Sequence, residues 1–452
     1  MATDWDVAIV GAGGAGLLAG LAAAREGVKT VLFERMKSPA RKVAISGGGR
    51  CNFTNTLEAR QFVKLFGDKH AKVLGRPLAA FSNQDLIDLL GRYGVSGEVE
   101  RGYRLYTKSG RGMDVVESLV KEFQQAGGQL VTQARVTAFN SGDKNFQLDV
   151  LIGGNARPDV TSPREARGKP GPTDALGASH EVFKTKTVII ATGGLSYPAT
   201  GSTGDGYEWA KELGHAVTPL KAALVGLNVE EEWPRKIPGT ALDDVRVELY
   251  ELTGENVAAP KPVATERAEL LFTHFGVSGP CILDLSNAFV GNNLKRAQLR
   301  IDFFPDVTRE ALDQRLLDTF KSGPQRTLLK ALDGWLTTRL LETLVNRLGG
   351  ETQVPVARLP KELRLKMLDQ LKSTRLTISG TRGIEYGEVT AGGIAWDEID
   401  ANTLESKKTP GVFFAGEILD LAGRCGGFNL QAAFSTGYFA GQHAAKRAQQ
   451  IT

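Results

Sequence analysis

The sequence predicts an α/β fold in which a parallel sheet is assembled from both ends of the chain, with a β-rich and a helical segment inserted between them. Three observations predict this organisation. Residues 5–10 form a short apolar run that leads through a glycine-rich turn into an Ala-rich helix at 17–25, the pattern of a β-α-β unit. A second strand, loop and helix follow at 411–446. Between these two ends, the hydrophobic pattern changes in character near residues 196 and 375.

The N-terminal part continues with alternating strand and helix patterns. Strands are expected at 28–33, 129–139, 146–152 and 183–191, and helices at 81–96 and 113–127. The stretch 153–179 is rich in Pro, Gly and Arg, and we expect it to be a mobile surface loop.

The middle of the chain predicts two inserted segments. Short strand-like runs between Gly and Pro residues indicate a β-rich substrate domain over 196–307. Leucines at helical spacing indicate a helical subdomain over 308–378. Residues 379–452 return to the α/β pattern, so we expect them to complete the domain that 1–195 begins.

Composition sets limits on the class of protein. The 452 residues are 42% hydrophobic and 23% charged, which is ordinary for a globular protein, and the net charge of +4 permits an anionic partner without requiring one. Three scattered cysteines favour a reducing compartment over a disulfide framework. The apolar run at 8–24 resembles a signal peptide, but Asp4 and Asp6 precede it and no Lys or Arg does. We therefore expect a cytoplasmic protein that does not enter the membrane.

The first motif that carries chemistry is Gly11-Ala12-Gly13-Gly14-Ala15-Gly16, which matches G-x-G-x-x-G after a strand and before a helix. Gly11 allows the tight turn, Gly13 lets a pyrophosphate reach backbone N–H groups, and Gly16 lets helix and strand pack closely. Glu34 ends the next strand, where a carboxylate accepts hydrogen bonds from ribose hydroxyls and disfavours a 2′-phosphate. The bound dinucleotide is therefore expected to be FAD or NAD.

A second glycine-rich motif, residues 46–52, reads SGGGRCN and follows Arg41 and Lys42. Three consecutive glycines cost conformational entropy, so they favour a backbone that approaches a flat or anionic ligand closely. Arg50 and Asn52 can supply directional donors to that ligand.

Two further motifs end predicted strands. Gly193 in ATGG lets the chain turn under a nucleotide, and Gly416-Glu417 opens a glycine-rich loop that leads to a helix start near 430. The dipole of a second helix start stabilises negative charge near flavin N1 on reduction, whereas NAD needs no such second clamp. This favours FAD.

Five strings together, GAGGAG with Glu34, RKVAISGGGRCNFTN, ATGGLSYPATGSTGDGY, LFTHFGVSGP and GEILDLAGRCGGFNLQAAFSTG, resemble the BaiN/RdsA-type NAD(P)/FAD-dependent oxidoreductases. The resemblance covers nearly the whole chain. It implies a Rossmann-like FAD-binding domain of glutathione-reductase type, assembled from both chain ends, with an inserted β-rich domain and a helical subdomain. Ala40 stands where the family usually has glycine. The residues that the resemblance implies as lining FAD are Gly11, Gly13, Gly16, Glu34, Lys42, Ser46, Gly48, Arg50, Asn52, Gly416, Asp420, Gly427, Asn429, Leu430 and Gln431.

The sequence contains no second G-x-G-x-x-G in the right order, so NAD(P)H is expected only as a transient electron donor over the flavin. Cys51, Tyr197 and His274 are the candidate proton donors. For Cys51 the alternative is small-residue packing, and for His274 it is a structural role. The five histidines are spread singly, so no metal site is expected.

The resemblance implies two reaction types. One is reduction of a conjugated C=C bond, in a steroid enone or in a uridine of ribosomal RNA to give dihydrouridine. The other is O2-dependent oxidation of a small amino ketone. Seven Lys and Arg residues between Arg358 and Arg382 form a stripe that could meet RNA phosphates, although a solvated helix face is the plainer interpretation. A flavin-binding module without catalysis is the alternative outside the enzymes.

Overall fold

The computed structural model describes residues 3–142, 145–153, 178–253, 257–349 and 353–451. Most of the loop expected at 153–179 lies outside these ranges. The chain forms two compact units: unit 1 joins 1–221 to 388–452, and unit 2 is 222–387. The first part of unit 1 therefore extends past the expected boundary at 195 to residue 221, and its second part begins at 388, later than the expected 379.

The centre of unit 1 is a parallel sheet with the strand order β6-β2-β1-β9-β19. Its strands are β1 (Thr3–Val10), β2 (Thr30–Glu34), β6 (Gln129–Thr132), β9 (Ser179–Ile190) and β19 (Val412–Phe414). β2 is buried along its whole length, as expected for a parallel strand that is covered on both faces. The pairing of β19 with β9 brings the last part of the chain into the sheet that the first part begins.

An antiparallel extension of this sheet is formed by β7 (Ala134–Ser141) and β8 (Phe146–Ile152), which continue from β9. The single strand expected at 129–139 is wrong, because the chain breaks at Gln133. The φ angle of Gln133 is 52°, in the left-handed region, so the residues on either side cannot form one strand.

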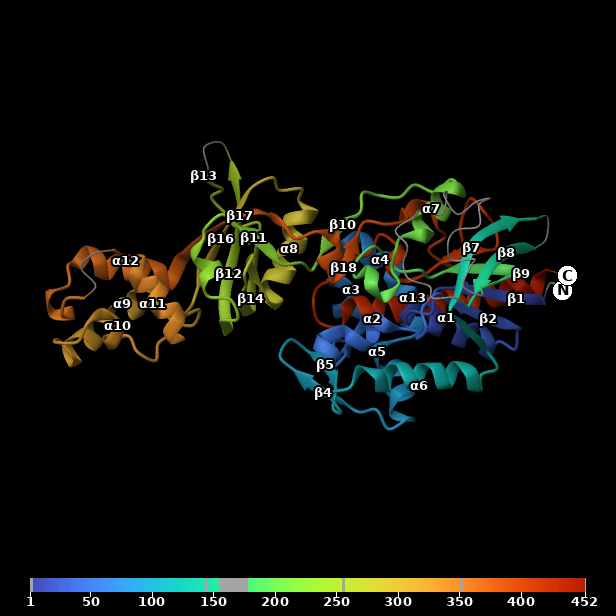
Figure 1. Ribbon diagram of the computed structural model, residues 1–452, viewed down its shortest axis with the longest axis horizontal. Helices are drawn as coiled ribbons and strands as arrows, with labels where there is room; N and C mark the ends of the chain where they lie inside the picture. The colour runs from blue at the N-terminus through green and yellow to red at the C-terminus, as the bar shows by residue number, and fades with distance from the viewer. Residues whose placement is uncertain (1–2, 143–144, 154–177, 254–256, 350–352, 452) are drawn as a thin grey trace. The chain divides into compact units, whose positions relative to one another are not determined.

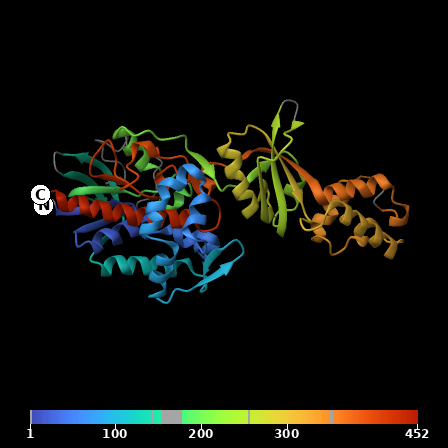
Figure 2. The same ribbon diagram turned by 180° about the vertical axis from the view of Figure 1, so that it is seen from behind.

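Helices cover both the sheet and its edges. The long helix α13 (Phe428–Gln450), drawn red, runs beside α1 (Gly14–Arg25) near the chain ends (Figures 1 and 2). The predicted helices at 81–96 and 113–127 correspond to α5 and α6. The remaining elements of unit 1 are α2 (Arg41–Ile45), α3 (Ala59–Lys64), α4 (Gly67–Ala80), α5 (Asn83–Gly91), α6 (Gly112–Gln125), α7 (Asp205–Glu212), β3 (Asn52–Asn55), β4 (Gly97–Glu100), β5 (Arg104–Thr107) and β18 (Val389–Ala391).

Unit 2 begins within the short strand β10 (Lys221–Ala223), and its strand pairings form a closed ring. Six antiparallel strands pair in the ring β12-β14-β15-β11-β17-β16 and back to β12. Each of these six strands therefore pairs with a strand on either side. The strands are β11 (Leu227–Val229), β12 (Ala241–Thr253), β13 (Val257–Ala258), β14 (Ala264–Phe272), β15 (Gly276–Ser278), β16 (Ala297–Asp302) and β17 (Thr374–Thr381).

The helices of unit 2 share one hydrophobic core with this ring of strands. Leu299 of β16, Leu316 of α9 and Leu368 of α12 belong to the same buried cluster. Two segments were expected as separate domains, at 196–307 and 308–378. From residue 222 onward they contribute to one packed unit. The helices are α8 (Pro280–Gly291), α9 (Arg309–Ser322), α10 (Leu328–Ala331), α11 (Thr338–Asn346) and α12 (Lys361–Ser373).

Candidate functional site

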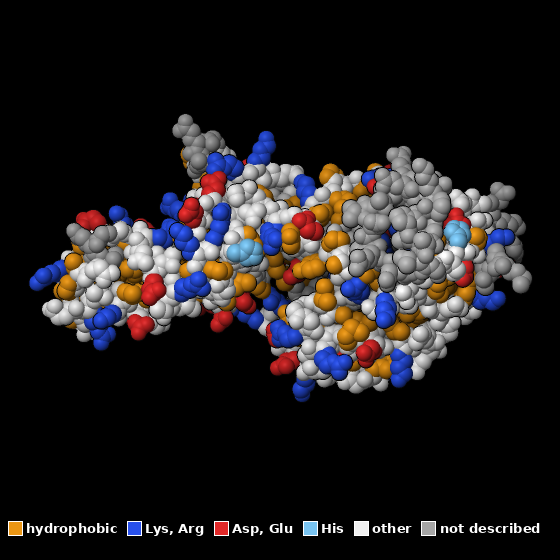
Figure 3. Space-filling view, viewed as in Figure 1, with side chains coloured by type: hydrophobic (Ala, Val, Ile, Leu, Met, Phe, Trp, Pro, Cys, Tyr) orange, Lys and Arg blue, Asp and Glu red, His pale blue; other side chains and the backbone are white. Residues whose placement is uncertain are grey.

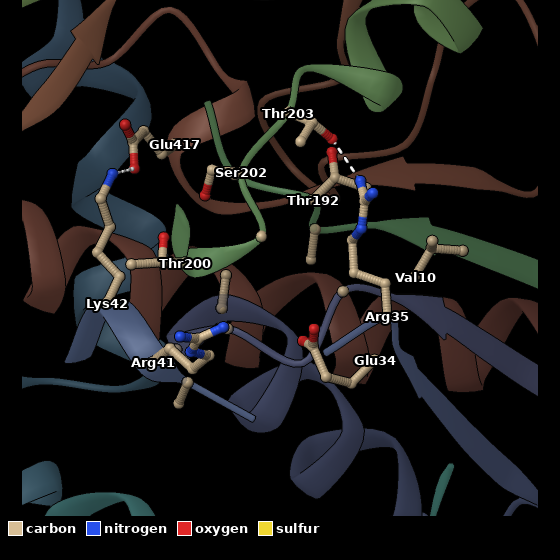
Figure 4. A pocket seen from close by; sticks show the side chains of 18 of the residues that line it. Val10, Glu34, Arg35, Arg41, Lys42, Thr192, Thr200, Ser202, Thr203 and Glu417 are labelled. Atoms are coloured by element: carbon tan, nitrogen blue, oxygen red, sulfur yellow. Dashed lines mark hydrogen bonds and ion pairs between the residues drawn. The ribbon is translucent and has the colours of Figure 1, made fainter. Parts of the chain in front are cut away.

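A cleft enclosing about 990 Å³ of empty space, part of it open to solvent, lies in unit 1. It opens where β1, β2 and β9 end, at the carboxyl edge of the parallel sheet, which is where ligands bind in open α/β folds. Figure 4 shows charged side chains entering it from several elements. The charged residues that line it are Glu34, Arg35, Arg41, Lys42, Arg135, Asp205 and Glu417.

The glycine turn between β1 and α1 is set by close packing. Gly11 has φ 99°, and a Cβ added there would lie 2.6 Å from the carbonyl oxygen of Ala191. A Cβ on Gly16 would lie 1.8 Å from the oxygen of Gly11. Gly13 instead faces open space and lines the cleft, and the helix after it has no side-chain cap. The backbone N–H groups of the first turn of α1 are therefore available to an anion in the cleft.

The carboxylate of Glu34 lies at the end of β2 with only 8% of the residue exposed. Its Oε2 accepts a hydrogen bond from the N–H of Ala12 at 3.1 Å, and its Oε1 accepts one from Met36 at 2.8 Å. Burial raises the pKa of Glu34 to about 7, against the opposing effect of these two donors. The carboxyl is thus held rigidly beside the glycine turn, as ribose recognition requires.

Ala40, the departure from the family pattern, lies in the left-handed region with φ 47° and ψ 35°. Its N–H donates to the oxygen of Ala12 at 2.8 Å, which ties the segment before α2 to the glycine turn. The left-handed backbone explains why the family favours glycine at this position, since only glycine adopts it without a steric cost.

A second polar cluster lies elsewhere in the cleft and joins four separate segments. Lys42 Nζ donates to Glu417 Oε2 at 2.7 Å and to Ser196 Oγ at 2.6 Å. Ser196 in turn donates to Glu417 Oε1 at 2.8 Å, and the N–H of Thr390 donates to the same oxygen. Figure 4 shows the contact between Lys42 and Glu417. The positive charge of Lys42 is therefore held in place by a carboxylate from the C-terminal part of the chain.

Of the cofactor residues predicted from the sequence, seven line the cleft: Gly11, Gly13, Glu34, Lys42, Gly193, Glu417 and Leu430. Ten do not: Gly16, Ser46, Gly48, Arg50, Asn52, Gly416, Asp420, Gly427, Asn429 and Gln431.

Several of these ten residues have structural contacts instead. Gln431 is fully buried, and its Oε1 accepts a hydrogen bond from Thr54 at 2.7 Å. Asn429 accepts one from the N–H of Gly423, also at 2.7 Å. A Cβ on Gly427 would lie 2.3 Å from the oxygen of Thr54. The contacts of Gln431 and Gly427 hold the start of α13 against β3, and that of Asn429 ties the preceding loop to the helix.

The SGGG segment adopts a backbone that only glycine favours. Gly47, Gly48 and Gly49 all have positive φ, at 56°, 69° and 89°. A Cβ on Gly47 would also lie 2.7 Å from the ring of Tyr106. Arg50 lies over that same ring at 4.2 Å from its centre and pairs with Glu100.

None of the three candidate proton donors is among the residues that line the cleft of unit 1. Cys51 is fully buried, and burial raises the pKa of its thiol to about 11. Tyr197 is 39% exposed, and its pKa is raised by partial burial and by Glu388. His274 belongs to unit 2 and is exposed.

Sequence reasoning missed several residues of the cleft, among them Arg35, Arg135 and Asp205. Arg35 had one local signal, because it directly follows Glu34. Asp205 lies in the ATGGLSYPATGSTGDGY string but was not singled out, and Arg135 belongs to no motif and reaches the site only through the fold. Within the described ranges, no group of three or more His, Cys, Asp or Glu side chains is placed to hold a metal ion. None of the described helices is long and apolar enough to cross a membrane.

Comparison with known proteins agrees with this architecture. A family profile described as the HI0933-like protein Rossmann domain matches residues 5–159 and 170–443. The chain is 29% identical to the ribosomal RNA dihydrouridine synthase of Escherichia coli K12, over 97% of both chains. It is 28% identical to the 3-dehydro-bile acid delta(4,6)-reductase of Clostridium scindens, over 98% of this chain and 99% of that one.

Among solved structures, the open conformation of a flavocytochrome c3 fumarate reductase shares the fold with a TM-score of 0.51. It is 17% identical to the chain, and the match covers 99% of this chain and 79% of the other. The chain therefore belongs to the HI0933-like family, has the Rossmann-type FAD-binding fold, and is an oxidoreductase of the BaiN/RdsA type, as the sequence predicts.

Proposed function

We propose that the chain is an FAD-dependent reductase that adds hydride to a conjugated C=C bond, and that its substrate is a uridine of ribosomal RNA. The observation that carries the proposal is the cleft. One continuous lining contains the glycine turn of α1, the buried carboxyl of Glu34 and the pair formed by Lys42 and Glu417.

The residues of the cleft fit FAD. The first turn of α1 is suited to the diphosphate and Glu34 to the adenosine ribose. The lining contains four cationic side chains and three carboxylates, which leaves a net positive charge for an anionic cofactor. When bound, FAD would supply hydride transfer from its N5 atom. The chain's own contribution is to hold that cofactor, and Lys42 places a positive charge in the same cleft.

Two relatives support the type of substrate. The proteins from Escherichia coli and Clostridium scindens are named as a dihydrouridine synthase and a delta(4,6)-reductase, and both names describe reduction of a C=C bond. The first supports uridine as the substrate. The second, at almost the same identity, makes a steroid enone the second candidate substrate.

The stripe of Lys and Arg residues between Arg358 and Arg382 supports RNA as a binding partner only in part. Lys372 is 10% exposed and donates to Asp302 at 2.6 Å, and Arg364 pairs with Asp313. Both side chains are therefore used within unit 2. The exposed members are Arg358, Lys361, Lys366 and Arg375. On the face of this unit that Figure 3 shows, Lys and Arg side chains are mixed with Asp and Glu.

The test compares ribosomal RNA from wild-type cells, a deletion strain and a deletion strain that carries Lys42→Met. Mass spectrometry of RNA fragments should show a dihydrouridine that is lost on deletion and not restored by the variant. If the three RNAs contain the same dihydrouridines, the proposal that ribosomal RNA is the substrate is wrong. A purified protein that remains colourless after FAD is added would contradict FAD binding as well.

The electron donor is tested separately on purified protein. We propose NAD(P)H as a transient donor, so the flavin's visible absorbance should bleach on anaerobic addition of NADH or NADPH. Slow return of the absorbance in air favours the reductase, and fast return favours the O2-dependent oxidase of a small amino ketone. A flavin that neither nicotinamide reduces would favour a non-catalytic flavin-binding module.

A further inference from the structure

Two arginines from different strands meet at one end of the cleft. Arg35 directly follows Glu34 at the end of β2, and Arg135 is the second residue of β7. Both line the cleft and share one carboxylate: Asp205 lies 3.3 Å from Arg35 and 3.7 Å from Arg135. Thr203 completes the group, accepting a hydrogen bond from Arg35 at 2.5 Å (Figure 4).

Two hydrogen-bond donors of this group lack an acceptor within the described part of the chain. The Nε atoms of Arg35 and Arg135 are both buried, and among the residues that the structure describes neither has a hydrogen-bond partner. The side chains are 11% and 20% exposed, so water reaches these donors poorly. Burial lowers the pKa of Arg35, and the neighbouring charge of Arg135 acts in the same direction. Two cations and one carboxylate in a buried cleft indicate a ligand that supplies acceptors.

The position of the group indicates which part of a ligand it meets. In a β-α-β dinucleotide site, the diphosphate lies at the start of the helix and the adenosine ribose lies at the acidic end of the second strand. Arg35 is the residue after that acidic end. The N–H of Gln133 donates to the oxygen of Met36 at 3.1 Å, which brings the start of β7 beside the same point. The two arginines therefore lie on the adenosine side of Glu34.

We infer that Arg35 and Arg135 recognise the adenine base of FAD, and that Asp205 is the positioning residue that holds them there. This inference rests on the proposed function only for the identity of the cofactor. Adenine offers ring nitrogens as acceptors for the unpaired Nε–H groups, and its flat face can lie against a guanidinium plane. A phosphate at this point is disfavoured, because the carboxylates of Glu34 and Asp205 line the same part of the cleft.

The test uses the full chain freed of flavin and titrated separately with FAD, ADP and FMN. Arg135→Met is the main variant, because it leaves the pair between Arg35 and Asp205 intact. Arg135→Lys keeps the charge but removes the planar Nε–H donor. Arg25→Met is the matched control, since Arg25 pairs with Glu122 on the surface of unit 1 and does not line the cleft.

The affinities for FAD and ADP should fall together in Arg135→Met, by about 10- to 100-fold, the loss expected for hydrogen bonds from a charged donor. Arg135→Lys should show a similar loss, and Arg25→Met none. FMN, which lacks adenine, should bind all four proteins alike. Circular dichroism and thermal unfolding establish that each variant is folded. If Arg135→Met does not fold, Arg135→Lys still tests the loss of the Nε–H donor.

Three outcomes would overturn the inference. ADP could bind Arg135→Met as tightly as wild type, FMN affinity could fall as much as FAD affinity, or the lysine variant could restore full affinity through charge alone. Failure of the cofactor assignment on which the inference rests has a different signature, because the wild-type protein itself would then bind no FAD. A wrong RNA substrate would leave these titrations unchanged and would appear only in the comparison of ribosomal RNAs.

Discussion

Among the single residues of the cleft, Glu34 combines two opposing demands. Its carboxyl must be available to a ribose, yet it lies 8% exposed at the end of a fully buried strand. Two backbone N–H groups partly offset the loss of hydration, but burial still raises the pKa of Glu34 from 4.5 to about 7. The protein therefore keeps a group that is expensive to ionise at the point where the cofactor is recognised.

The raised pKa has a defined effect on the stability of the flavin-free protein. The folded state binds a proton more tightly than the unfolded state, so the contribution of Glu34 is full below pH 4.5 and is lost as pH rises through about 7. Relative to Glu34→Gln, the free energy of unfolding should fall by up to about 3 kcal/mol from about pH 5 to about pH 8. Urea denaturation of both proteins across this range measures it. A difference that does not change with pH would contradict the raised pKa.

His215 predicts the opposite dependence. Its side chain is fully buried, with Nε2 2.7 Å from Ser406 Oγ and Nδ1 3.3 Å from Glu398. Burial lowers its pKa below 6.5 despite the opposing charge of Glu398. The stability it contributes is present above pH 6.5 and is lost as pH falls. Thermal unfolding should show wild type losing its advantage over His215→Gln in acid; an advantage that grows in acid would contradict this.

At the scale of elements, the contact between α1 and α13 joins the two ends of the chain. A Cβ on Gly437 would lie 2.1 Å from the oxygen of Ala15, and a Cβ on Gly441 would lie 2.1 Å from the oxygen of Ala19. Glycines four residues apart therefore let the two helix backbones touch. This contact also fixes the start of α1, which faces the cleft.

Adding a single methyl group at this contact should be costly. Gly437→Ala should lower the free energy of unfolding by about 1–3 kcal/mol, because overpacking forces the helices apart. It should also weaken FAD binding, since α1 moves with the contact. Gly75→Ala in α4 is the control: that glycine is exposed and a Cβ meets nothing within 4 Å, so stability should stay equal or rise by up to about 1 kcal/mol. Thermal unfolding measures the stability of both variants against wild type. Equal losses of stability in the two variants would contradict the packing argument.

At the scale of the whole molecule, the two units differ in how they use the chain. Unit 2 is the continuous stretch 222–387, and its strand ring closes within itself. Unit 1 is discontinuous, because β19 and α13 return to the sheet and helix formed by the first residues. Its folding therefore requires both chain ends.

Two shortened chains test this division. A protein in which a Gly/Ser linker replaces 222–387 should fold cooperatively and bind FAD, because the cleft is lined entirely by unit 1. A protein that ends at 387 lacks β19 and α13, so it should leave apolar surface of α1 exposed and fail to fold cooperatively. Circular dichroism melts and flavin fluorescence measure both. Cooperative folding of the truncated chain would show that unit 1 does not need its C-terminal part.

The sequence predicted the parts of the protein whose signals are local. The β-α-β unit, the glycine turn and the acid at its end could be identified because each backbone demand is met by residues close together in the chain. Gly11 shows this directly, since its left-handed turn and its close approach to Ala191 permit no side chain. The five strings that carry the family resemblance extended the prediction from this unit to the whole fold.

Tertiary structure alone decided which side chains meet. Arg135 belongs to no motif and Asp205 was not singled out within its string, and both reach the cleft because distant segments converge at the carboxyl edge of the sheet. In the same way, Gln431, which the resemblance implies at the cofactor, accepts a hydrogen bond from Thr54, 377 positions away. Hydrophobic periodicity and turn chemistry describe neighbours along the chain, whereas these contacts depend on strand order and helix packing, which sequence spacing does not encode.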